Sequence, residues 1–341
     1  MTEKEIIRRI IEHDSPVRIG HCFKKTSNDM CFTDGARFDL SGKPYQDWGY
    51  YPELLKQISS FDGEVRLDLF GNIYGRLNEK TKGECIKGAL TDGWELMDRF
   101  CLPDIDFSYY ESLGDLKTNT KFTVAQLPFA VFAPLRDTRL MDNALMDILT
   151  GPEYVSQFLD KVSDENVKII RALGKAGCDS VIMYDDWGTQ TGTLISPQAF
   201  KEVFVPVYRK ISEALKENKM KFILHSCGYN RAFLDDLIDL GVDVFQFDQL
   251  ELYGVENLAN EYANKVSFLS PVDVQKVLPA GDRKYIEESA LRMVEAFKKC
   301  GGGLIAMDYP NYQDIAVSEE WADWARNIII ENSTLQKELF L

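Results

Sequence analysis

Several features that the sequence lacks exclude whole classes of protein. No apolar run approaches the roughly 20 residues that cross a bilayer, and Met1–Ile6 lacks the apolar core of a signal peptide, so we expect a cytoplasmic protein without a membrane partner. An excess of basic residues is also missing, because 39 Lys and Arg face 54 Asp and Glu, which gives a formal charge of −15. Nucleic-acid binding needs clustered cations that replace condensed counterions, and we therefore expect no nucleic-acid partner.

Other signals are absent as well. The seven cysteines are odd in number, scattered and without a CxxC pair, which is a poor disulfide framework, so we expect reduced thiols. No Gly-rich phosphate-binding fingerprint follows an early strand candidate, which argues against a dinucleotide-binding fold. No repeat of 20–50 residues and no low-complexity linker marks a boundary, and we predict that residues 1–341 form one domain.

What is present is an alternation of short β-rich apolar runs with amphipathic helical patterns, which is typical of parallel βα units. From about residue 120 onward, strands are predicted at Phe122–Leu127, Ser180–Tyr184, Phe222–His225, Val242–Phe247, Val266–Leu269 and Leu304–Asp308. Helices are predicted at Pro152–Gly174, Pro197–Glu217, Ala232–Leu240, Arg283–Lys299 and Glu319–Ile330. Two earlier runs, Val17–Cys22 and Val65–Phe70, bring the number of predicted strands to eight.

Eight parallel strands favour a closed (β/α)8 TIM barrel, which commonly reaches this length within one domain. An open doubly wound sheet is the alternative. Residues 23–62 are rich in turn formers and poor in periodicity. We predict that they form an elaborated loop over the mouth of the barrel.

Parallel barrels place their active sites at the carboxyl ends of the strands, so polar residues that close the predicted strands are the candidates. The sharpest feature is His225-Ser-Cys227-Gly, because side chains at i and i+2 of a strand point to the same side and both are good zinc ligands. An unliganded buried pair is the alternative. Zinc would need at least one more protein ligand, and Asp308 at the end of the last predicted strand is the candidate, unless its carboxylate binds loop amides. Cys300 precedes that strand and is expected at the opposite end of the barrel.

Other strand ends offer acids and substrate contacts. Asp185 and Asp186 follow one strand directly, and only one of the two can point into the mouth because neighbouring side chains diverge. One of these acids, or Asp248, could orient substrate or move a proton, whereas a helix cap or a loop hydrogen bond is the alternative. The aromatic residues of 45–51 are a candidate wall or core. Substrate contacts are predicted for His21, Trp187, Gln246 and Tyr309.

With these residues identified, residues 120–330 resemble the uroporphyrinogen decarboxylase superfamily. Three stretches carry the resemblance in order, namely Tyr184–Gly192 with Ile195-Ser-Pro, His225-Ser-Cys-Gly followed by Leu237–Phe245, and Gly301–Ile305. The segment Asp68–Gly75 also resembles a piece common in the methyltransferase branch of the superfamily. The resemblance implies a TIM barrel that is either a metal-free tetrapyrrole decarboxylase or a zinc methyltransferase working with a corrinoid protein.

Two differences separate these branches in the sequence. Decarboxylases similar to the founding enzyme carry an arginine-rich stretch near the first strand, whereas Val17–Phe23 has a single arginine. Coenzyme M enzymes of the superfamily use an HxC pair plus a late cysteine as zinc ligands. His225 and Cys227 match the pair, but Asp308-Tyr-Pro-Asn-Tyr-Gln lacks the late cysteine. A mixed nitrogen, sulfur and oxygen ligand set is more similar to the ether-demethylating relatives.

The resemblance therefore implies O-demethylation: transfer of a methyl group from a small substrate, first of all a methoxylated aromatic, to a corrinoid, with zinc as Lewis acid. The reverse transfer from a methylcobamide is equally compatible with the sequence. No corrinoid-binding module is visible, so the corrinoid is expected on a partner protein. A decarboxylase of the founding type and a non-catalytic barrel that binds a corrinoid or a small molecule stay open.

Overall fold

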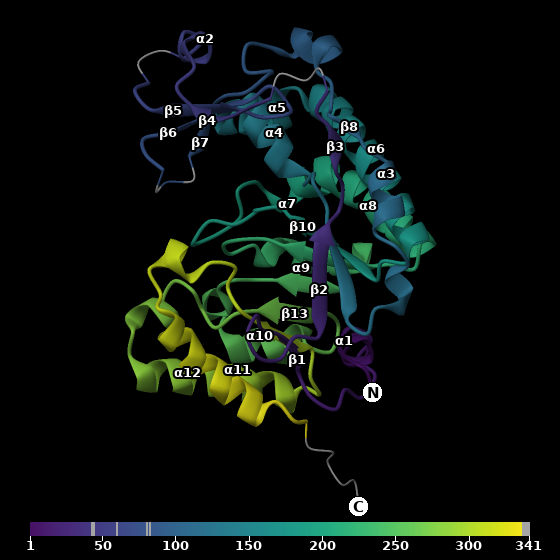
Figure 1. Ribbon diagram of the computed structural model, residues 1–341, viewed down its shortest axis with the longest axis vertical. Coiled ribbons are helices and arrows are strands. Elements are labelled where there is room, and N and C mark those ends of the chain that lie inside the picture. Colours follow the sequence, from purple (N-terminus) through teal and green to yellow (C-terminus); the bar gives the residue numbers. More distant parts are fainter. Residues whose placement is uncertain (42–44, 59–60, 80, 82, 336–341) are drawn as a thin grey trace, which may run out of the picture.

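The computed structural model describes residues 1–41, 45–58, 61–79, 81 and 83–335. Eight strands of the described residues form one parallel sheet in the order β1-β14-β13-β12-β11-β10-β9-β2, which curls into a nearly closed barrel (Figure 1). Their bounds are β1 Gly20–Cys22, β2 Met30–Asp34, β9 Phe122–Gln126, β10 Ser180–Tyr184, β11 Lys221–His225, β12 Val244–Gln246, β13 Ser267–Ser270 and β14 Leu304–Met307. The predicted TIM barrel is confirmed.

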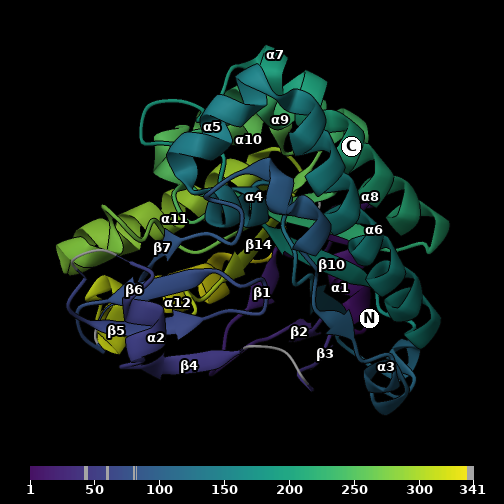
Figure 2. The same ribbon diagram turned by 90° about the horizontal axis from the view of Figure 1, so that it is seen from above.

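Helices surround the strands (Figure 2). The barrel helices are α6 Pro152–Ala176, α7 Pro197–Ala199, α8 Val205–Glu217, α9 Arg231–Leu240, α10 Val255–Tyr262, α11 Arg283–Lys299 and α12 Glu319–Asn332. A π-helical stretch, Phe200–Phe204, joins α7 to α8. Short 3₁₀ helices lie at Trp94–Arg99, Leu116–Thr118, Leu250–Leu252, Leu278–Ala280 and Tyr312–Ile315. Among the described residues, no helix has the length and apolar character needed to span a membrane.

The amino end of the barrel is closed by helix α1, Glu3–Ile11. Thr2 caps this helix by accepting a hydrogen bond from the backbone N–H of Glu5, and its isoleucines repeat at helical spacing along one face. Four isoleucines, Ile6, Ile7, Ile10 and Ile11, pack against the inward side chains of the strands, which include Met30, Phe122, Val124, Ile182, Ile223, Val244, Leu269 and Ile305. This apolar plug leaves the carboxyl ends of the strands as the open mouth.

One predicted barrel strand lies elsewhere. Part of Val65–Phe70 forms β5, Glu64–Leu67, which pairs antiparallel within a separate four-stranded sheet, together with β4 Gln46–Gly49, β6 Ile73–Arg76 and β7 Glu84–Lys87. The missing barrel strand is β2, which pairs in parallel with β9 over five residues. Residues 23–62, predicted to be a loop, thus contain regular structure, although 42–44 and 59–60 lie outside the described residues.

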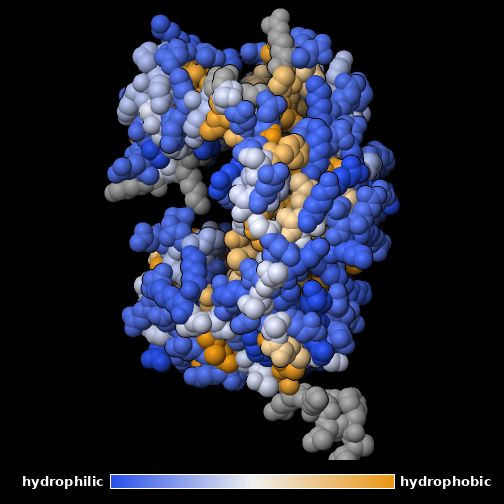
Figure 3. Space-filling view, turned by 45° about the vertical axis from the view of Figure 1, so that its right-hand side comes forward, coloured by the Kyte–Doolittle hydropathy of each residue, from blue (hydrophilic) through white to orange (hydrophobic). Residues whose placement is uncertain are grey.

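The four-stranded sheet overhangs the barrel mouth. One face packs on helix α2, Pro52–Leu55, through Leu54, Val65 and Ile73. The segment Asp68–Tyr74 shares a cavity with residues at the carboxyl ends of β9 and β10. The sheet therefore lies above the strand ends in Figure 1, and the space-filling view is hollowed on the side where it overhangs (Figure 3). The remaining elements are β3 Phe38–Asp39, β8 Asp104–Ile105, α3 Ser108–Ser112, α4 Phe132–Arg139 and α5 Met141–Thr150.

Candidate metal centre at the barrel mouth

Three side chains suited to metal binding lie together just beyond β10 and β11. Ligand atoms of Asp186, His225 and Cys227 are all within 4.8 Å of one another. The Cys227 Sγ lies 3.3 Å from His225 Nε2, which in turn lies 3.3 Å from Asp186 Oδ1. Asp186 Oδ1 also accepts a hydrogen bond from the backbone N–H of Cys227 at 2.8 Å. The structure thus brings the predicted pair together and adds Asp186 as a third candidate ligand.

Strand alternation explains why these three side chains meet. Ile182 on β10 and Ile223 on β11 point into the barrel, so every second residue after them continues on the inner side. Asp186 lies four residues beyond Ile182, and His225 and Cys227 lie two and four beyond Ile223. Since β10 and β11 are parallel and in register, these residues arrive at the mouth side by side.

The two loops that carry Asp186 and Cys227 are held together by glycines. The Gly188 N–H donates to the Cys227 carbonyl at 3.1 Å, and the Tyr229 N–H donates to the Thr189 carbonyl at 2.7 Å. A Cβ on Gly188 would lie only 2.5 Å from the backbone carbon of Gly228, which itself has a φ of +76°. Glycine at both positions therefore permits the close approach of the loops.

A hydrogen-bonded chain orients His225. Its Nδ1 contacts the Gln246 Oε1, and the Gln246 Nε2 donates to Asp248 Oδ1 at 2.8 Å. Because an amide oxygen can only accept, Nδ1 carries the hydrogen, and Nε2 is left facing Asp186 and Cys227. The ring of Tyr184 lies 5.0 Å from the His225 ring, centre to centre, and limits its movement on the other side.

The three side chains shift one another's pKa values. Burial lowers the pKa of His225, but the hydrogen bonds that join it to Asp186 and Cys227 outweigh burial and raise its pKa to about 10. Burial raises the pKa of Asp186, but the hydrogen bond and charge of His225 together with the hydrogen bonds from Cys227 outweigh burial and lower it, whereas burial raises the pKa of Cys227. A site that keeps a proton on a buried imidazole will also attract a metal dication, which displaces that proton on binding.

The donor set fits zinc. Ligand atoms about 2.0–2.3 Å from a tetrahedral Zn²⁺ lie about 3.3–3.8 Å from one another, and the two measured separations fall at the short end of this range. One nitrogen, one sulfur and one oxygen give three protein ligands with a fourth position open. This arrangement is typical of catalytic zinc sites, since structural sites are usually closed by four protein ligands.

A cavity of about 240 Å³ opens beside the group. The ring of Tyr184 lines it and also packs against His225, so the cavity adjoins the candidate ligands. Other lining residues come from the overhanging sheet, from the end of β9 and from α4, and include Asp68, Phe70, Tyr74, Gln126 and Asp137. A small pocket that combines apolar surface with several polar groups, next to candidate metal ligands, is compatible with an active site.

Asp308, the predicted third ligand, is not brought to this group. Met307 packs toward the barrel interior, so Asp308 points outward into the helical layer. There its carboxylate pairs with Arg326 at 2.9 Å, accepts from the Tyr312 hydroxyl at 3.0 Å and accepts from the backbone N–H of Lys24 at 2.8 Å. These partners satisfy the buried charge, and the ligand prediction for Asp308 does not agree with this placement.

Three other candidates also lie outside the mouth. Asp185 is fully buried and accepts from the N–H groups at the start of α4 and from the Tyr208 hydroxyl, and burial raises its pKa to about 6. Trp187 is fully buried among phenylalanines, and its Nε1 donates to Tyr208 at 2.8 Å. His21 lies between Ile19 and Phe23 of the outer core, and burial lowers its pKa to about 4. These three residues are buried between the barrel strands and the helical layer, and we assign them a structural role.

Gln246, Asp248 and Tyr309 remain at the mouth. Gln246 is buried and contacts His225 directly, so its place is behind the candidate ligand. Asp248 is half-buried, and the charges of Asp248 and Cys227 contribute, after burial, to raising the pKa of Tyr309. Cys300 ends α11 before the amino end of β14, as expected.

Sequence reasoning missed three residues of this region. Tyr184 closes β10 two positions before Asp186, and the i, i+2 rule that selected His225 and Cys227 also selects this pair. Tyr74 and Asp137 come from β6 and α4, and the Tyr74 hydroxyl donates to Asp137 Oδ2 at 2.8 Å. No local pattern marks them, because their approach to the mouth depends on how the additional sheet folds back. Of the aromatic residues of 45–51, predicted to form a wall or core, Trp48 lies on that sheet and Tyr51 packs against the small core of Leu54, Val65 and Ile73.

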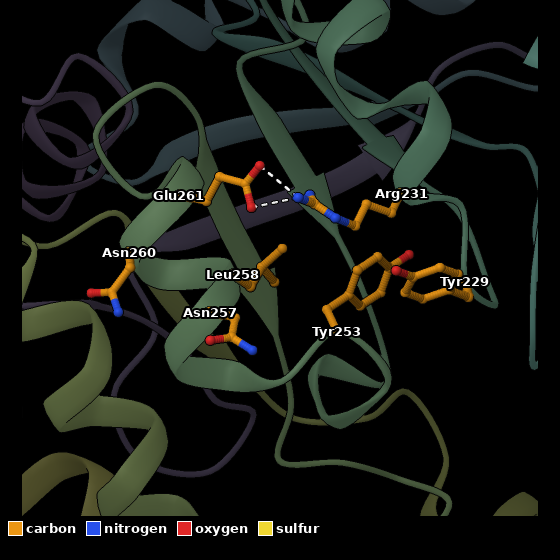
Figure 4. Close-up of a pocket in the computed structure, with 7 residues that line it drawn as sticks. All are labelled: Tyr229, Arg231, Tyr253, Asn257, Leu258, Asn260 and Glu261. Atoms are coloured by element: carbon orange, nitrogen blue, oxygen red, sulfur yellow. Dashed lines mark hydrogen bonds and ion pairs between the residues drawn. The ribbon is translucent and has the colours of Figure 1, made fainter.

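A larger groove of about 510 Å³ lies on the outside of the barrel between α9 and α10 (Figure 4). Figure 4 shows Arg231 bridged to Glu261, with an N–O distance of 2.6 Å, and the rings of Tyr229 and Tyr253 side by side. None of Asp186, His225 and Cys227 lines it. The groove adjoins the mouth through Tyr229, whose backbone N–H donates to the Thr189 carbonyl, and through the Tyr253 hydroxyl, which donates to the Gly228 carbonyl at 2.8 Å.

Fold and site together define a TIM barrel with a candidate metal centre at the carboxyl-terminal mouth. Residues 120–307, more than half of the chain, match the family model described as uroporphyrinogen decarboxylase (URO-D). The chain therefore belongs to the uroporphyrinogen decarboxylase family.

Within this family, curated relatives are named as methyltransferases. The chain is 31% identical over 103 residues to methylcobamide:CoM methyltransferase MtbA of Methanosarcina acetivorans, covering 30% of each chain. It is 26% identical over 164 residues to the protein of the same name from Methanosarcina mazei, covering 47% of each chain. The matches thus span less than half the length of these relatives.

A solved structure covers nearly the whole chain. It is a methyltransferase from Methanosarcina mazei, which aligns with 97% of this chain and 99% of its own at a TM-score of 0.64 and 13% sequence identity. At this identity the likeness shows a shared fold.

Proposed function

We propose that the protein transfers a methyl group between a small methoxylated aromatic compound and the cobalt of a corrinoid on a partner protein, with zinc held by Asp186, His225 and Cys227. The observation that carries the proposal is the meeting of these three ligands beside a small cavity at the barrel mouth. The names of the curated relatives support methyl transfer involving a cobamide. Asp186 replaces Asp308 as the third ligand in this proposal.

When bound, zinc would supply a Lewis acid that lowers the basicity of the departing phenolic oxygen. The protein's own side chains provide the rest. Gln246 fixes the His225 ring so that Nε2 faces the other two ligands. Asp248, half-buried beside Gln246, is placed to exchange a proton with a substrate oxygen at the mouth.

The cavity fits an aromatic substrate. Phe70, Tyr74 and Tyr184 supply ring surfaces, and Leu127 and Pro128 add apolar contacts. Aromatic rings gain from such edge and face contacts beyond the burial of apolar area. Tyr309 is a further candidate substrate contact, because burial and the charges of Asp248 and Cys227 raise the pKa of its hydroxyl.

We infer that the corrinoid protein docks on the mouth face. Helix α1 closes the other end of the barrel, so cobalt can reach a methyl group at the candidate ligands only from the carboxyl ends of the strands. The hollow beneath the overhanging sheet leaves room for such an approach (Figure 3). Both the partner and a cytoplasmic location remain predictions.

The test mixes zinc-loaded protein, purified without chelators or a histidine tag, with a reduced corrinoid protein and a panel of aryl methyl ethers. We expect the cobalt absorption spectrum to change to that of methyl-cobalt with at least one ether. Cys227→Ala should abolish the change, whereas Cys300→Ala, which removes a thiol at the other end of the barrel, should retain it.

Two outcomes would contradict the proposal. Absence of methyl-cobalt across the panel, together with release of carbon dioxide from a porphyrinogen, would assign the protein to the decarboxylases. Binding of an ether or a corrinoid without turnover would indicate a non-catalytic barrel.

A further inference from the structure

Arg66 of β5 occupies an unusual position on the overhanging sheet. Val65 and Leu67 face α2, so Arg66 lies on the opposite face, together with Trp48 and Tyr74. Its guanidinium carbon lies 5.2 Å from the ring centre of Trp48 and 4.4 Å from that of Tyr74. Because Tyr74 lines the mouth cavity, this face of the sheet is the one that looks toward the barrel.

The Arg66 guanidinium forms no ion pair among the described residues, although its charge partly offsets the rise that burial causes in the pKa of Asp68. Among these residues, its Nε is buried without a hydrogen-bond partner. Arg76 on the same face offers a direct contrast, because it lies 4.5 Å from the Trp48 ring and pairs with Glu64 at 2.7 Å. A buried donor without a partner costs free energy, which a ligand could recover.

The nearby carboxylates are already occupied. Asp68 accepts from the backbone N–H groups of Phe70 and Asn72 and from the Asn72 side chain. Asp137 accepts from the Tyr74 hydroxyl at 2.8 Å and from Arg136 Nε at 2.8 Å. The positive charge of Arg66 is therefore left available to a ligand in or above the cavity.

Two tyrosines of the cavity wall link the cavity to Arg66 and to the candidate metal centre. Tyr184 lines the cavity and lies 5.0 Å, ring centre to ring centre, from His225, and Tyr74 lines it and lies 4.4 Å from the Arg66 guanidinium carbon, although Arg66 itself is not a lining residue. A substrate that lies in the cavity between Tyr184 and Tyr74, with its methyl group toward the ligands, would bring its other end to the Tyr74 side, where Arg66 lies. A guanidinium that contacts two aromatic rings has restricted freedom, and its planar fork can bind a carboxylate or sulfonate through two parallel hydrogen bonds.

We propose that Arg66 is a specificity-determining residue that binds an oxyanion on the substrate, so that the substrate is a methoxylated aromatic acid. This inference rests on the proposed function, because it uses the same cavity. It adds the chemical class of the substrate's far end, which neither the metal ligands nor the family determines.

The test measures binding alone, by titration calorimetry on the zinc-loaded protein. The probes are 4-methoxybenzoate and its neutral analogue of nearly the same shape, 4-methoxybenzamide. We expect the acid to bind about tenfold more tightly than the amide, as for a charge-assisted pair in a partly buried site. Arg66→Gln should bring the two affinities within about twofold of each other, because the neutral side chain removes the charge-assisted pair.

Arg76→Gln is the matched control, since it removes the other arginine stacked on Trp48 and should keep the preference for the acid. Arg66→Lys keeps a positive charge without the planar fork and should show an intermediate preference, which provides a second variant if Arg66→Gln does not fold. Equal affinities for acid and amide in the unaltered protein would overturn the proposal. So would an equal loss of preference in Arg66→Gln and Arg76→Gln.

Cyanocobalamin, whose nucleotide loop carries a phosphodiester, is the probe for a competing source of the oxyanion. Arg66-dependent binding of cyanocobalamin without Arg66-dependent binding of 4-methoxybenzoate would assign the residue to the corrinoid and overturn the substrate assignment. None of these measurements requires turnover. A protein that binds the acid through Arg66 but forms no methyl-cobalt would contradict the proposed reaction while supporting this inference.

Discussion

At the scale of single residues, Gln246 has the largest influence on the candidate ligands without being one. Its amide oxygen contacts His225 Nδ1, and its amide nitrogen is held by Asp248 at 2.8 Å. The direction of this hydrogen-bonded chain leaves Nε2 as the nitrogen that faces the other two candidate ligands. The residue belongs to the inner layer of the barrel, where its side chain is almost fully buried.

Gln246→Leu should therefore weaken zinc binding by about 10–100-fold, because the imidazole loses the partner that fixes its tautomer and orientation. The measurement is competition with a chromogenic zinc chelator. Gln126→Leu is the matched control, since Gln126 ends β9 and lines the cavity but has no hydrogen bond to His225. Equal zinc affinities for the two variants would contradict the assigned role.

A single site residue could be predicted from the sequence only where the inward-facing positions of its strand were known, because successive side chains point to opposite faces. His225 and Cys227 could be predicted as a pair from the sequence, because two types of metal ligand stand at i and i+2 and therefore point to the same side of the strand. The choice between Asp185 and Asp186 needed the inward face of β10, which an all-apolar strand does not reveal. The same ambiguity misplaced Asp308, because Leu304–Met307 is apolar on both faces and its inward side is known only from the packed barrel.

At the scale of elements, the candidate metal centre depends on two loops that follow neighbouring strands. Asp186 and Cys227 approach because the chain after β10 lies against the chain after β11 at Gly188 and Gly228. A side chain at either glycine would clash with backbone atoms of the other loop. Relieving that clash would move the two loops apart. The ligand geometry is thus a property of this contact as much as of the ligands.

Gly228→Ala should destabilise the protein by about 2–3 kcal/mol, through the left-handed backbone and the clash with Gly188. It should also lower zinc affinity, because the Cys227 loop must move. Gly192→Ala, in the same loop as Gly188, meets no atom within 4 Å and should change stability by less than about 0.5 kcal/mol. Chemical denaturation and zinc titration check both effects, and unchanged zinc affinity in Gly228→Ala would contradict the role of the loop contact.

Element prediction succeeded where strands and helices alternate and failed near the amino terminus. The strands from β9 to β14 follow one pattern, buried on both faces, whereas Met30–Asp34 alternates buried and partly exposed residues. The run Val65–Phe70 has a suitable β pattern, but a pattern does not tell which sheet a strand joins. From its pattern, Val65–Phe70 is therefore predicted as the eighth barrel strand, whereas the eighth strand of the barrel is Met30–Asp34.

At the scale of the whole molecule, the core is apolar and lies apart from the candidate metal centre. The interior of the barrel and its helical layer are closed by two large apolar clusters. Asp186, His225 and Cys227 belong to neither cluster and lie above both at the mouth. The stability of the protein and the chemistry of its mouth are therefore largely separable.

Removal of zinc should accordingly leave the protein folded. We expect chelation to leave the far-ultraviolet circular dichroism spectrum unchanged and to lower the melting temperature only modestly. Zinc at 100 times its Kd adds about 2.7 kcal/mol of stability, which corresponds to about 4 °C for a chain of this size. Cys227→Ala should melt at the same temperature with and without zinc, which shows that the shift arises at the candidate centre. Loss of the circular dichroism spectrum on chelation would instead identify a structural metal, because a catalytic site with an open position is not expected to hold the barrel together.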